Sequence, residues 1–290
     1  MTNRNNPTAQ HNPATRDNLP TRDNLAGRDN LAGRDDMAAE SDRRRPVDIT
    51  IGVLCLDTAF TKIPGHIRNP VTFGFPVRYR VVRGATPRRV VTEADPTLLD
   101  PFIDAARELE AAGVAAITAA CGFLVLFQQR LADAVRIPLY SSSLIQLPMV
   151  HRMLAANQRV GLLVADETAL TPRHLAAIGG ESVPICVAGM SGYPEFREVI
   201  LEGRRPDLNA DRLGSEVLGA VEKLAASNPD LGALVIECTD LVPYGHAIQQ
   251  RLGLPVFDIV SLTEMVHRTL SHKPFHREER TRRSEAELGR

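Results

Sequence analysis

Two cysteines stand at matching places in the sequence, each at the end of an apolar run. The run ITAA precedes Cys121, and the run LVIE precedes Cys238. Such runs predict parallel strands, and open α/β sheets bind ligands at the carboxyl ends of their strands. A thiol at this edge also faces the N-terminus of the next helix, which favours the thiolate. We therefore predict two thiols at a ligand site, each with a pKa at or below the usual value of about 8.5.

The segments around these cysteines repeat in the chain. The shared features are GVLCLD and GLLVAD, a cysteine 17 positions before a proline, a QQRL string, and MVHR, in the same order in both copies. Their offsets lie between 109 and 121 residues. Four repeated features in the same order indicate duplication of an α/β unit, with the two copies meeting near Asn157.

The duplication suggests which reaction the two thiols could carry out. If the two copies face each other, Cys121 and Cys238 lie on opposite sides of one cleft. Two thiols across a cleft can remove a proton from one face of a carbon and return one to the other face, which is racemisation or epimerisation. An isolated cysteine is more often an inert core residue. That interpretation is kept for Cys55 and Cys186, which have no counterpart in the other copy.

Short apolar runs alternate with helical patterns between the two ends of the chain, which predicts an α/β fold with parallel sheets. The predicted strands are Ile49–Leu54, Val77–Val82, Val114–Ala119, Ile137–Tyr140, Val160–Val164, Val183–Val187, Ala233–Ile236 and Pro255–Asp258. The predicted helices are Thr97–Ala112, Leu124–Val135, Leu144–Ala156, Thr171–Ile178, Pro194–Leu201, Ala210–Ala226, Tyr244–Leu252 and Ser261–Leu270.

The predicted organisation has four parts. Residues 1–46 carry a degenerate six-residue repeat of the form RDNLAG, which predicts a disordered leader. Residues 47–157 and 158–270 are the two α/β domains, and the last helix is expected to pack back on the first domain. Residues 271–290 form a charged tail.

Composition narrows the classes of partner. The chain has 290 residues with 34 basic and 35 acidic ones, so nucleic acid and anionic membranes are disfavoured as partners. Aromatic residues make up 4% and tryptophan is absent, which disfavours base-stacking or sugar-binding surfaces. No segment has the length of a transmembrane helix or the pattern of a secretory signal. We expect a cytoplasmic protein with four free thiols and a small-molecule ligand.

Three motifs resemble the cofactor-independent aspartate/glutamate/hydantoin racemases over about residues 49–270. They are AACGF at 119–123, ECTDL at 237–241, and LDT at 56–58. The resemblance implies two pseudo-symmetric α/β domains with the active site between them, no pyridoxal phosphate or other cofactor, and a homodimer as the usual assembly. The first motif departs from the glutamate racemases, which have asparagine and threonine where this chain has Gly122 and Phe123. That departure suggests a less polar or bulkier substrate than glutamate.

Further site residues are expected around the thiols. The long loop at 56–76 is placed to close over a ligand. The predicted binding residues come from this loop and from the two cysteine motifs: Asp57, Thr58, Asn69, Thr72, Gly122, Phe123, Thr239 and Asp240. The backbone amides of the last four are expected to stabilise enolate-like charge. A turn-capping role is an equal alternative for Asp57.

The remaining polar candidates receive structural interpretations. Glu237 and Asp240 flank Cys238 and either raise its pKa or form solvated surface, which we favour. Asp166 is assigned to capping, and His151 and His267 are assigned structural roles. His246 is a minor candidate for proton transfer. No His, Cys, Asp or Glu spacing supports a metal site.

The sequence leaves the reaction open. The first hypothesis is a racemase acting on an amino acid, a hydantoin or a related carboxylate, with Cys121 and Cys238 as acid and base. The second keeps the site but changes the reaction to decarboxylation or double-bond (cis–trans) isomerisation. The third is a non-catalytic protein that binds a small ligand on the same scaffold.

Overall fold

The computed structural model describes residues 49–272, and the structural statements below concern that range. The predicted leader at 1–46 and nearly all of the predicted tail at 271–290 lie outside it. Within 49–272, no helix combines the length and apolar character that crossing a membrane requires.

Eight short strands divide equally between two parallel sheets. The first sheet has the order β2-β1-β3-β4, and the second has the equivalent order β6-β5-β7-β8. The strands are β1 (Ile51–Cys55), β2 (Val77–Val81), β3 (Ala116–Ala119), β4 (Leu139–Tyr140), β5 (Arg159–Val164), β6 (Ile185–Gly189), β7 (Leu231–Ile236) and β8 (Val256–Phe257). Each lies where the sequence predicted a strand, within a few residues. The shared strand order confirms two equivalent α/β halves.

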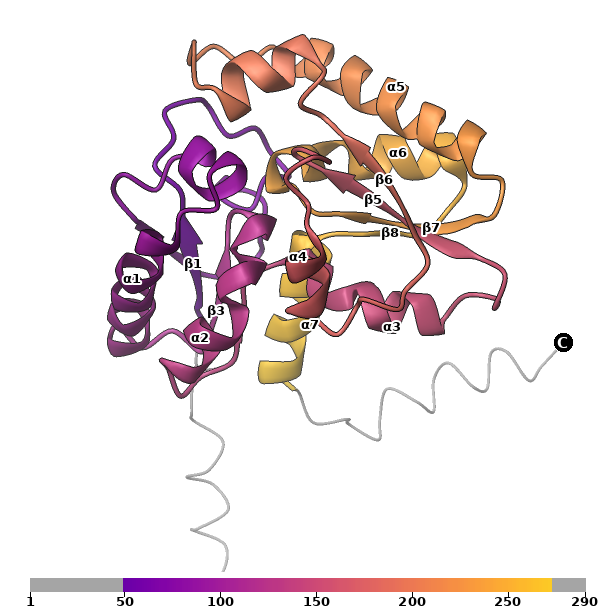
Figure 1. Ribbon diagram of the computed structural model, residues 1–290. Coiled ribbons are helices and arrows are strands. Elements are labelled where there is room, and N and C mark those ends of the chain that lie inside the picture. The colour runs from indigo at the N-terminus through magenta and orange to yellow at the C-terminus, as the bar shows by residue number, and fades with distance from the viewer. Residues whose placement is uncertain (1–48, 273–290) are drawn as a thin grey trace, which may run out of the picture. The chain divides into compact units, whose positions relative to one another are not determined.

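Helices link the strands and cover the sheets (Figure 1). The α-helices are α1 (Leu99–Ala111), α2 (Gln128–Asp133), α3 (Leu147–Arg152), α4 (Pro172–Ala176), α5 (Ala210–Ser227), α6 (Gly245–Leu252) and α7 (Ile259–Leu270). Short 3₁₀ helices are η3 (Pro96–Leu98), η4 (Gly122–Phe127), η5 (Ser143–Gln146) and η7 (Thr239–Tyr244). Two π-helices, η2 (Arg88–Thr92) and η6 (Phe196–Leu201), follow the edge strands β2 and β6.

Apolar spacing explains which helix faces are buried. In α1 the buried residues Phe102, Ala105, Ala106 and Leu109 recur at helical spacing, and the other face is largely polar. In the second half, α5 buries an equivalent stripe. Figure 1 shows α5 and α6 over one face of the second sheet and α3 on the other.

The glycine that the two repeats share has a packing role. A Cβ at Gly52 in β1 would lie 3.1 Å from Leu109 Cδ1, and a Cβ at Gly161 in β5 would lie 2.8 Å from Leu231 Cδ1. Larger residues would therefore push apolar side chains away from the central strand. The repeated glycine allows close packing at equivalent places in both sheets.

The two halves exchange helices. The segment η5–α3 follows the first sheet in sequence, yet Leu144, Leu147 and Val150 join the cluster that covers one face of the second sheet. In the opposite direction, α7 follows the second sheet and contacts β3 of the first. Two hydrogen bonds fix this arrangement: a buried one from Ser143 Oγ to the Ile236 carbonyl at 2.6 Å, and a partly buried one from Gln146 Nε2 to the Asp258 carbonyl at 3.0 Å.

Candidate active site

Both predicted catalytic cysteines line one inner pocket, which is built from residues of both halves. Cys121 follows β3 and precedes η4, and Cys238 follows β7 and precedes η7. Their exposed fractions are 8% and 7%. The inner pocket has a volume of about 30 Å³. That volume exceeds the roughly 10–15 Å³ that a cavity needs to hold one water molecule.

The apolar wall of the inner pocket comes from the two π-helices. Val91 of η2 and Ile200 of η6 line it, together with Phe196 and Leu201. Val91 and Ile200 are 109 residues apart, which is the spacing between the repeated glycines. The backbone matches as well, because Glu93 N donates to the Arg88 carbonyl in η2 and Glu202 N to the Arg197 carbonyl in η6. The duplication therefore extends to this wall, which the repeated sequence features did not include. The first π-helix was not predicted, and the second was predicted as an ordinary helix.

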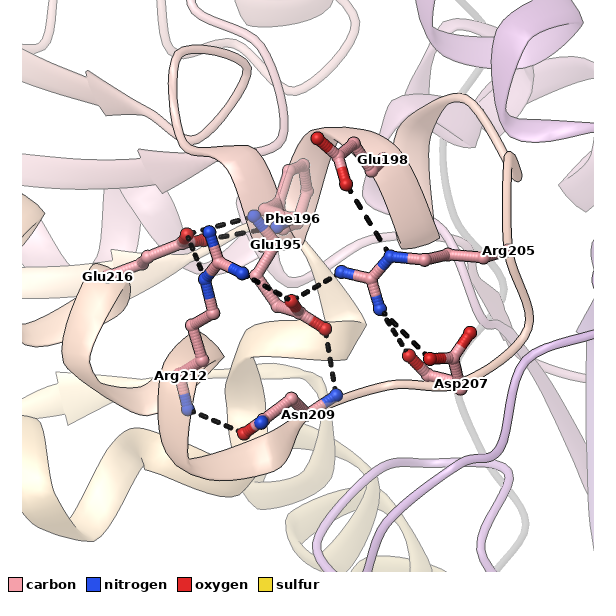
Figure 2. A network of polar contacts seen from close by, with 8 residues as sticks. All are labelled: Glu195, Phe196, Glu198, Arg205, Asp207, Asn209, Arg212 and Glu216. Atoms are coloured by element: carbon pink, nitrogen blue, oxygen red, sulfur yellow. Dashed lines mark hydrogen bonds and ion pairs between the residues drawn. The ribbon is translucent and has the colours of Figure 1, made fainter.

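A network of charged residues anchors this wall (Figure 2). Glu195 is 1% exposed and accepts hydrogen bonds from Arg205 Nη2 at 2.5 Å and from Asn209 N at 2.8 Å. The carboxylate of Glu216 on α5 accepts from Glu195 N at 2.9 Å and from Phe196 N at 3.1 Å. Segment 202–206 also borders an outer cavity of about 460 Å³, which shares Thr58, Pro87, Ile200 and Leu201 with the inner pocket.

The polar wall contains an ion pair that joins the two halves. Lys62 Nζ lies 2.9 Å from Asp240 Oδ1, and His66 Nε2 lies 3.1 Å from the same oxygen. Lys62 and His66 belong to loop 56–76 of the first half, whereas Asp240 begins η7 in the second. Burial raises the pKa of Asp240, but the charges and hydrogen bonds of Lys62 and His66 outweigh burial and hold that pKa well below its usual value. Asp240 is therefore a carboxylate at neutral pH.

The neighbours of the two thiols keep them protonated. Burial is the largest cause that raises the pKa of Cys121, and the carboxylate of Glu237 adds to it. Burial also raises the pKa of Cys238, followed by the charges of Asp240 and Glu237. Backbone amides oppose these effects only in part, so the lowered thiol pKa expected at a helix N-terminus is wrong. The Cys238 thiol also donates a hydrogen bond to Asp240 Oδ2, at an Sγ–Oδ2 distance of 3.9 Å.

Glu237 and Asp240 are pocket residues rather than solvated surface, which corrects the sequence-based interpretation. Glu237 is 1% exposed, and its Oε2 accepts a hydrogen bond from Ala165 N at 3.1 Å. Burial raises the pKa of Glu237 to about 8, although the amides of Ala165, Phe123 and Gly122 act in the opposite direction. A Cβ at Gly122 would lie 2.6 Å from the Glu237 carbonyl oxygen, so the glycine allows this close approach.

The other predicted binding residues divide into two groups. Thr58, Thr239 and Asp240 line the inner pocket. The remaining five do not: Asp57, Asn69, Thr72, Gly122 and Phe123. Asp57 borders the outer cavity and accepts a hydrogen bond from Gly84 N at 3.0 Å, as a turn-capping carboxylate does.

The other four residues outside the pocket make structural contacts. Asn69 Nδ2 donates to the Lys62 carbonyl, and Thr72 Oγ1 donates to the His66 carbonyl, so both shape loop 56–76. Phe123 packs edge-on against His174. The amides of Gly122 and Phe123 interact with Glu237, so they are already engaged by the protein's own carboxyl group.

The histidines and capping residues mostly follow expectation. His267 stacks on Phe75 with ring centroids 3.7 Å apart, which is a structural role. His246 is exposed on α6 and does not line the inner pocket. Asp166 Oδ1 accepts from Thr168 N at 2.9 Å and caps a turn. Cys55 is buried in β1, and Cys186 is partly buried in β6. Within the described residues, His, Cys, Asp and Glu side chains form no group of three that could hold a metal ion.

Three basic residues of the loop were not predicted as site residues. Lys62 and His66 contact Asp240, and Arg68 lines the same pocket. Arg68 Nη1 donates to Thr58 Oγ1 at 2.9 Å and to the Leu56 carbonyl at 3.1 Å. The only sequence signal for them was three basic side chains within a loop already expected to cover the site.

Comparison with known proteins places this site in a family. The model of the Asp/Glu/Hydantoin racemase family matches residues 91–265. The chain is 33% identical over 223 residues to dimethylsulfoniopropionate lyase 7 of Emiliania huxleyi, a match that covers 73% of this chain. The chain spans 64% of the length of that relative.

Solved structures share the fold. Allantoin racemase from Klebsiella pneumoniae superposes with a TM-score of 0.55 at 14% identity, covering 77% of this chain and 87% of the other. Unliganded arylmalonate decarboxylase gives 0.50 at 15% identity, covering 78% and 94%.

Proposed function

Because the chain belongs to the Asp/Glu/Hydantoin racemase family, we propose that it uses a pocket thiol to remove a proton from the carbon beside a substrate carboxylate. We propose further that the substrate is dimethylsulfoniopropionate and that the overall reaction is β-elimination. Two observations support the proposal: a pair of buried thiols lines one pocket beside cationic side chains, and the chain is similar to a dimethylsulfoniopropionate lyase.

The reaction balances with the groups in the pocket. A thiolate at Cys121 or Cys238 takes a proton from the α-carbon of the substrate. The electrons of that C–H bond form the new C=C bond, and the C–S bond breaks with its electron pair going to sulfur. The products are acrylate and neutral dimethyl sulfide, and the proton stays on the thiol until it is released to solvent. The leaving group is neutral, so this reaction needs one base and no second thiol as acid.

The pocket favours a substrate anion at its polar wall. Among the described residues, the Arg68 side chain donates to neutral oxygens only, so its charge is available to a carboxylate. Such a contact also stabilises the charge that grows on the carboxylate as the α-proton leaves. The thiol is held protonated in the free protein, so it must lose its proton before it can act as a base.

Racemisation is the second candidate, and the symmetry of the thiol pair favours it. Cys121 and Cys238 occupy equivalent strand ends of the two halves, as removal and return of a proton on opposite faces requires. Racemisation needs both thiols, whereas β-elimination needs one. The two proposals therefore differ in what they require of single cysteine variants.

The test is proton NMR in deuterated buffer with dimethylsulfoniopropionate, and in parallel with aspartate, glutamate and hydantoins. The elimination proposal expects vinyl signals of acrylate together with a signal of free dimethyl sulfide. Cys121→Ser or Cys238→Ser, whichever removes the base, should lower the rate by about 10²–10⁴-fold. Cys186→Ser is the matched control, because Cys186 lies in β6 outside the pocket, and its rate should stay within about threefold of wild type.

Each outcome decides between the candidates. Loss of the α-proton of an amino acid with inversion, abolished in both cysteine variants, would replace elimination by racemisation. Absence of acrylate at high enzyme concentration would reject the lyase proposal.

A further inference from the structure

The charged groups of the inner pocket are not all paired with each other. Lys62 and His66 share the carboxylate of Asp240, so these three groups form a self-contained cluster. That leaves one guanidinium, Arg68, and one carboxyl group, Glu237, among the ionisable residues of the pocket wall other than the thiols.

Arg68 carries a positive charge without a protein counter-charge. Its side chain donates to the Thr58 hydroxyl and the Leu56 carbonyl, and within residues 49–272 no carboxylate forms an ion pair with it. A guanidinium fixed by two neutral acceptors keeps further N–H groups for a ligand. Those N–H groups fit the two oxygens of a carboxylate.

Glu237, in contrast to Arg68, is an acidic group without a basic partner in the described range. It is 1% exposed, it lines the same pocket, and within the described range no Lys, Arg or His forms an ion pair with it. The hydrogen-bond donors to its carboxyl group are backbone amides. A buried carboxyl group without a cation is costly in its charged form, so a pKa of about 8 leaves Glu237 mostly protonated near pH 7 in the empty pocket. An onium group beside it favours the carboxylate and lowers that pKa.

The duplication shows that Glu237 breaks the symmetry of the site. Cys121 and Cys238 are equivalent, so the residue before each should also be equivalent. In the first half that residue is Ala120, and in the second it is Glu237. Both line the inner pocket, but only the second half brings a carboxyl group to it. The fold therefore does not require an acid at this position.

We propose, resting on the function proposed above, that Arg68 and Glu237 determine substrate specificity by selecting a zwitterion with one carboxylate and one onium group. The carboxylate binds at Arg68, and the sulfonium or quaternary ammonium lies beside Glu237. Its methyl groups then contact the apolar wall of Val91, Phe196 and Ile200.

The test compares two ligands of the same shape that differ in one charge. 3-(Trimethylammonio)propionate carries the cation, and 4,4-dimethylpentanoate replaces nitrogen by carbon. Calorimetry on the full-length protein should give a wild-type affinity for the cationic ligand at least about tenfold greater than for the neutral one, equivalent to about 1.4 kcal/mol. Glu237→Gln should remove about tenfold of that preference while the affinity for 4,4-dimethylpentanoate stays unchanged. Arg68→Met should weaken both ligands alike.

The control is Glu222→Gln, which removes a carboxylate from a surface pair with Arg251 and should keep the wild-type preference. Equal wild-type affinities for the two ligands overturn the inference even if a variant fails to fold. An unchanged preference in folded Glu237→Gln overturns it too. A preference that depends on Glu237, without elimination of dimethylsulfoniopropionate, rejects only the proposed reaction. Elimination together with an unchanged preference rejects only this inference.

Discussion

At the scale of single residues, the two thiols differ through their neighbours rather than through their position. Both cysteines follow equivalent strands, but Asp240 Oδ2 lies 3.9 Å from Cys238 Sγ, whereas within residues 49–272 no hydrogen bond joins the side chain of Cys121 to another side chain. Cys238 is therefore held as a thiol by an adjacent carboxylate. Cys121 has Glu237 as its principal charged neighbour, and neutralisation of Glu237 removes that repulsion.

The raised pKa of both thiols has a kinetic consequence. A base must be deprotonated to act, and below its pKa the thiolate fraction grows about tenfold for each pH unit. We expect kcat/KM for acrylate formation to rise continuously from pH 6 to pH 9 without reaching a plateau near 7. Initial rates across this range, with enzyme stability checked at each pH, measure it. A plateau below pH 7.5 would show that the base is not one of these buried thiols.

At the scale of secondary-structure elements, the strands place the two cysteines, whereas loops and helix ends determine which side chains surround the thiols. The apolar runs predicted all eight strands, and thereby placed both cysteines at the correct sheet edge, because strand ends follow directly from hydrophobic patterning. The partners of the thiols were not predictable in this way. Lys62 and Asp240 are 178 residues apart, and their contact depends on how loop 56–76 folds against the other half. The thiol pKa depends on burial by both halves, which local sequence does not reveal.

The π-helix η6 depends on the charged network of Figure 2 for its position. Glu195→Gln should lower the free energy of unfolding by about 1–3 kcal/mol, because the buried side chain loses its charge-assisted bond to Arg205. Urea denaturation measures this. Hydrogen exchange should also become faster in segment 202–209.

The control for that change is Glu198→Gln. Glu198 contacts the same arginine at 3.5 Å but is 34% exposed, so its loss should change stability by less than about 0.5 kcal/mol. Equal effects of the two substitutions would contradict the assigned role of the buried carboxylate.

At the scale of the whole molecule, the two halves are joined by exchanged helices and by a partly buried ion pair. Segment η5–α3 covers the second sheet, and α7 contacts the first. The Lys62–Asp240 pair adds an electrostatic link within the pocket itself. Ligand binding and the association of the halves therefore draw on the same residues.

This link predicts how stability depends on pH. The pKa of Asp240 is lower in the folded protein than its unfolded value of about 3.9, so its contribution is complete above that value and is lost as pH falls toward the folded pKa. At pH 7, Asp240→Asn should reduce the free energy of unfolding by about 3–5 kcal/mol, since Lys62 remains buried without its partner. Urea denaturation at pH 7, 5 and 3 should show a difference between wild type and variant that is similar at the first two and smaller at pH 3. A gap independent of pH would contradict the assignment.

The burial of the two sulfur atoms also affects how fast oxidants react with them. Peroxides attack thiolates far faster than thiols, and the first product is a sulfenic acid. Cys121 and Cys238 are each less than 10% exposed and are held in the protonated form. The same environment that delays formation of the base therefore protects both sulfur atoms from oxidative damage while the pocket is empty.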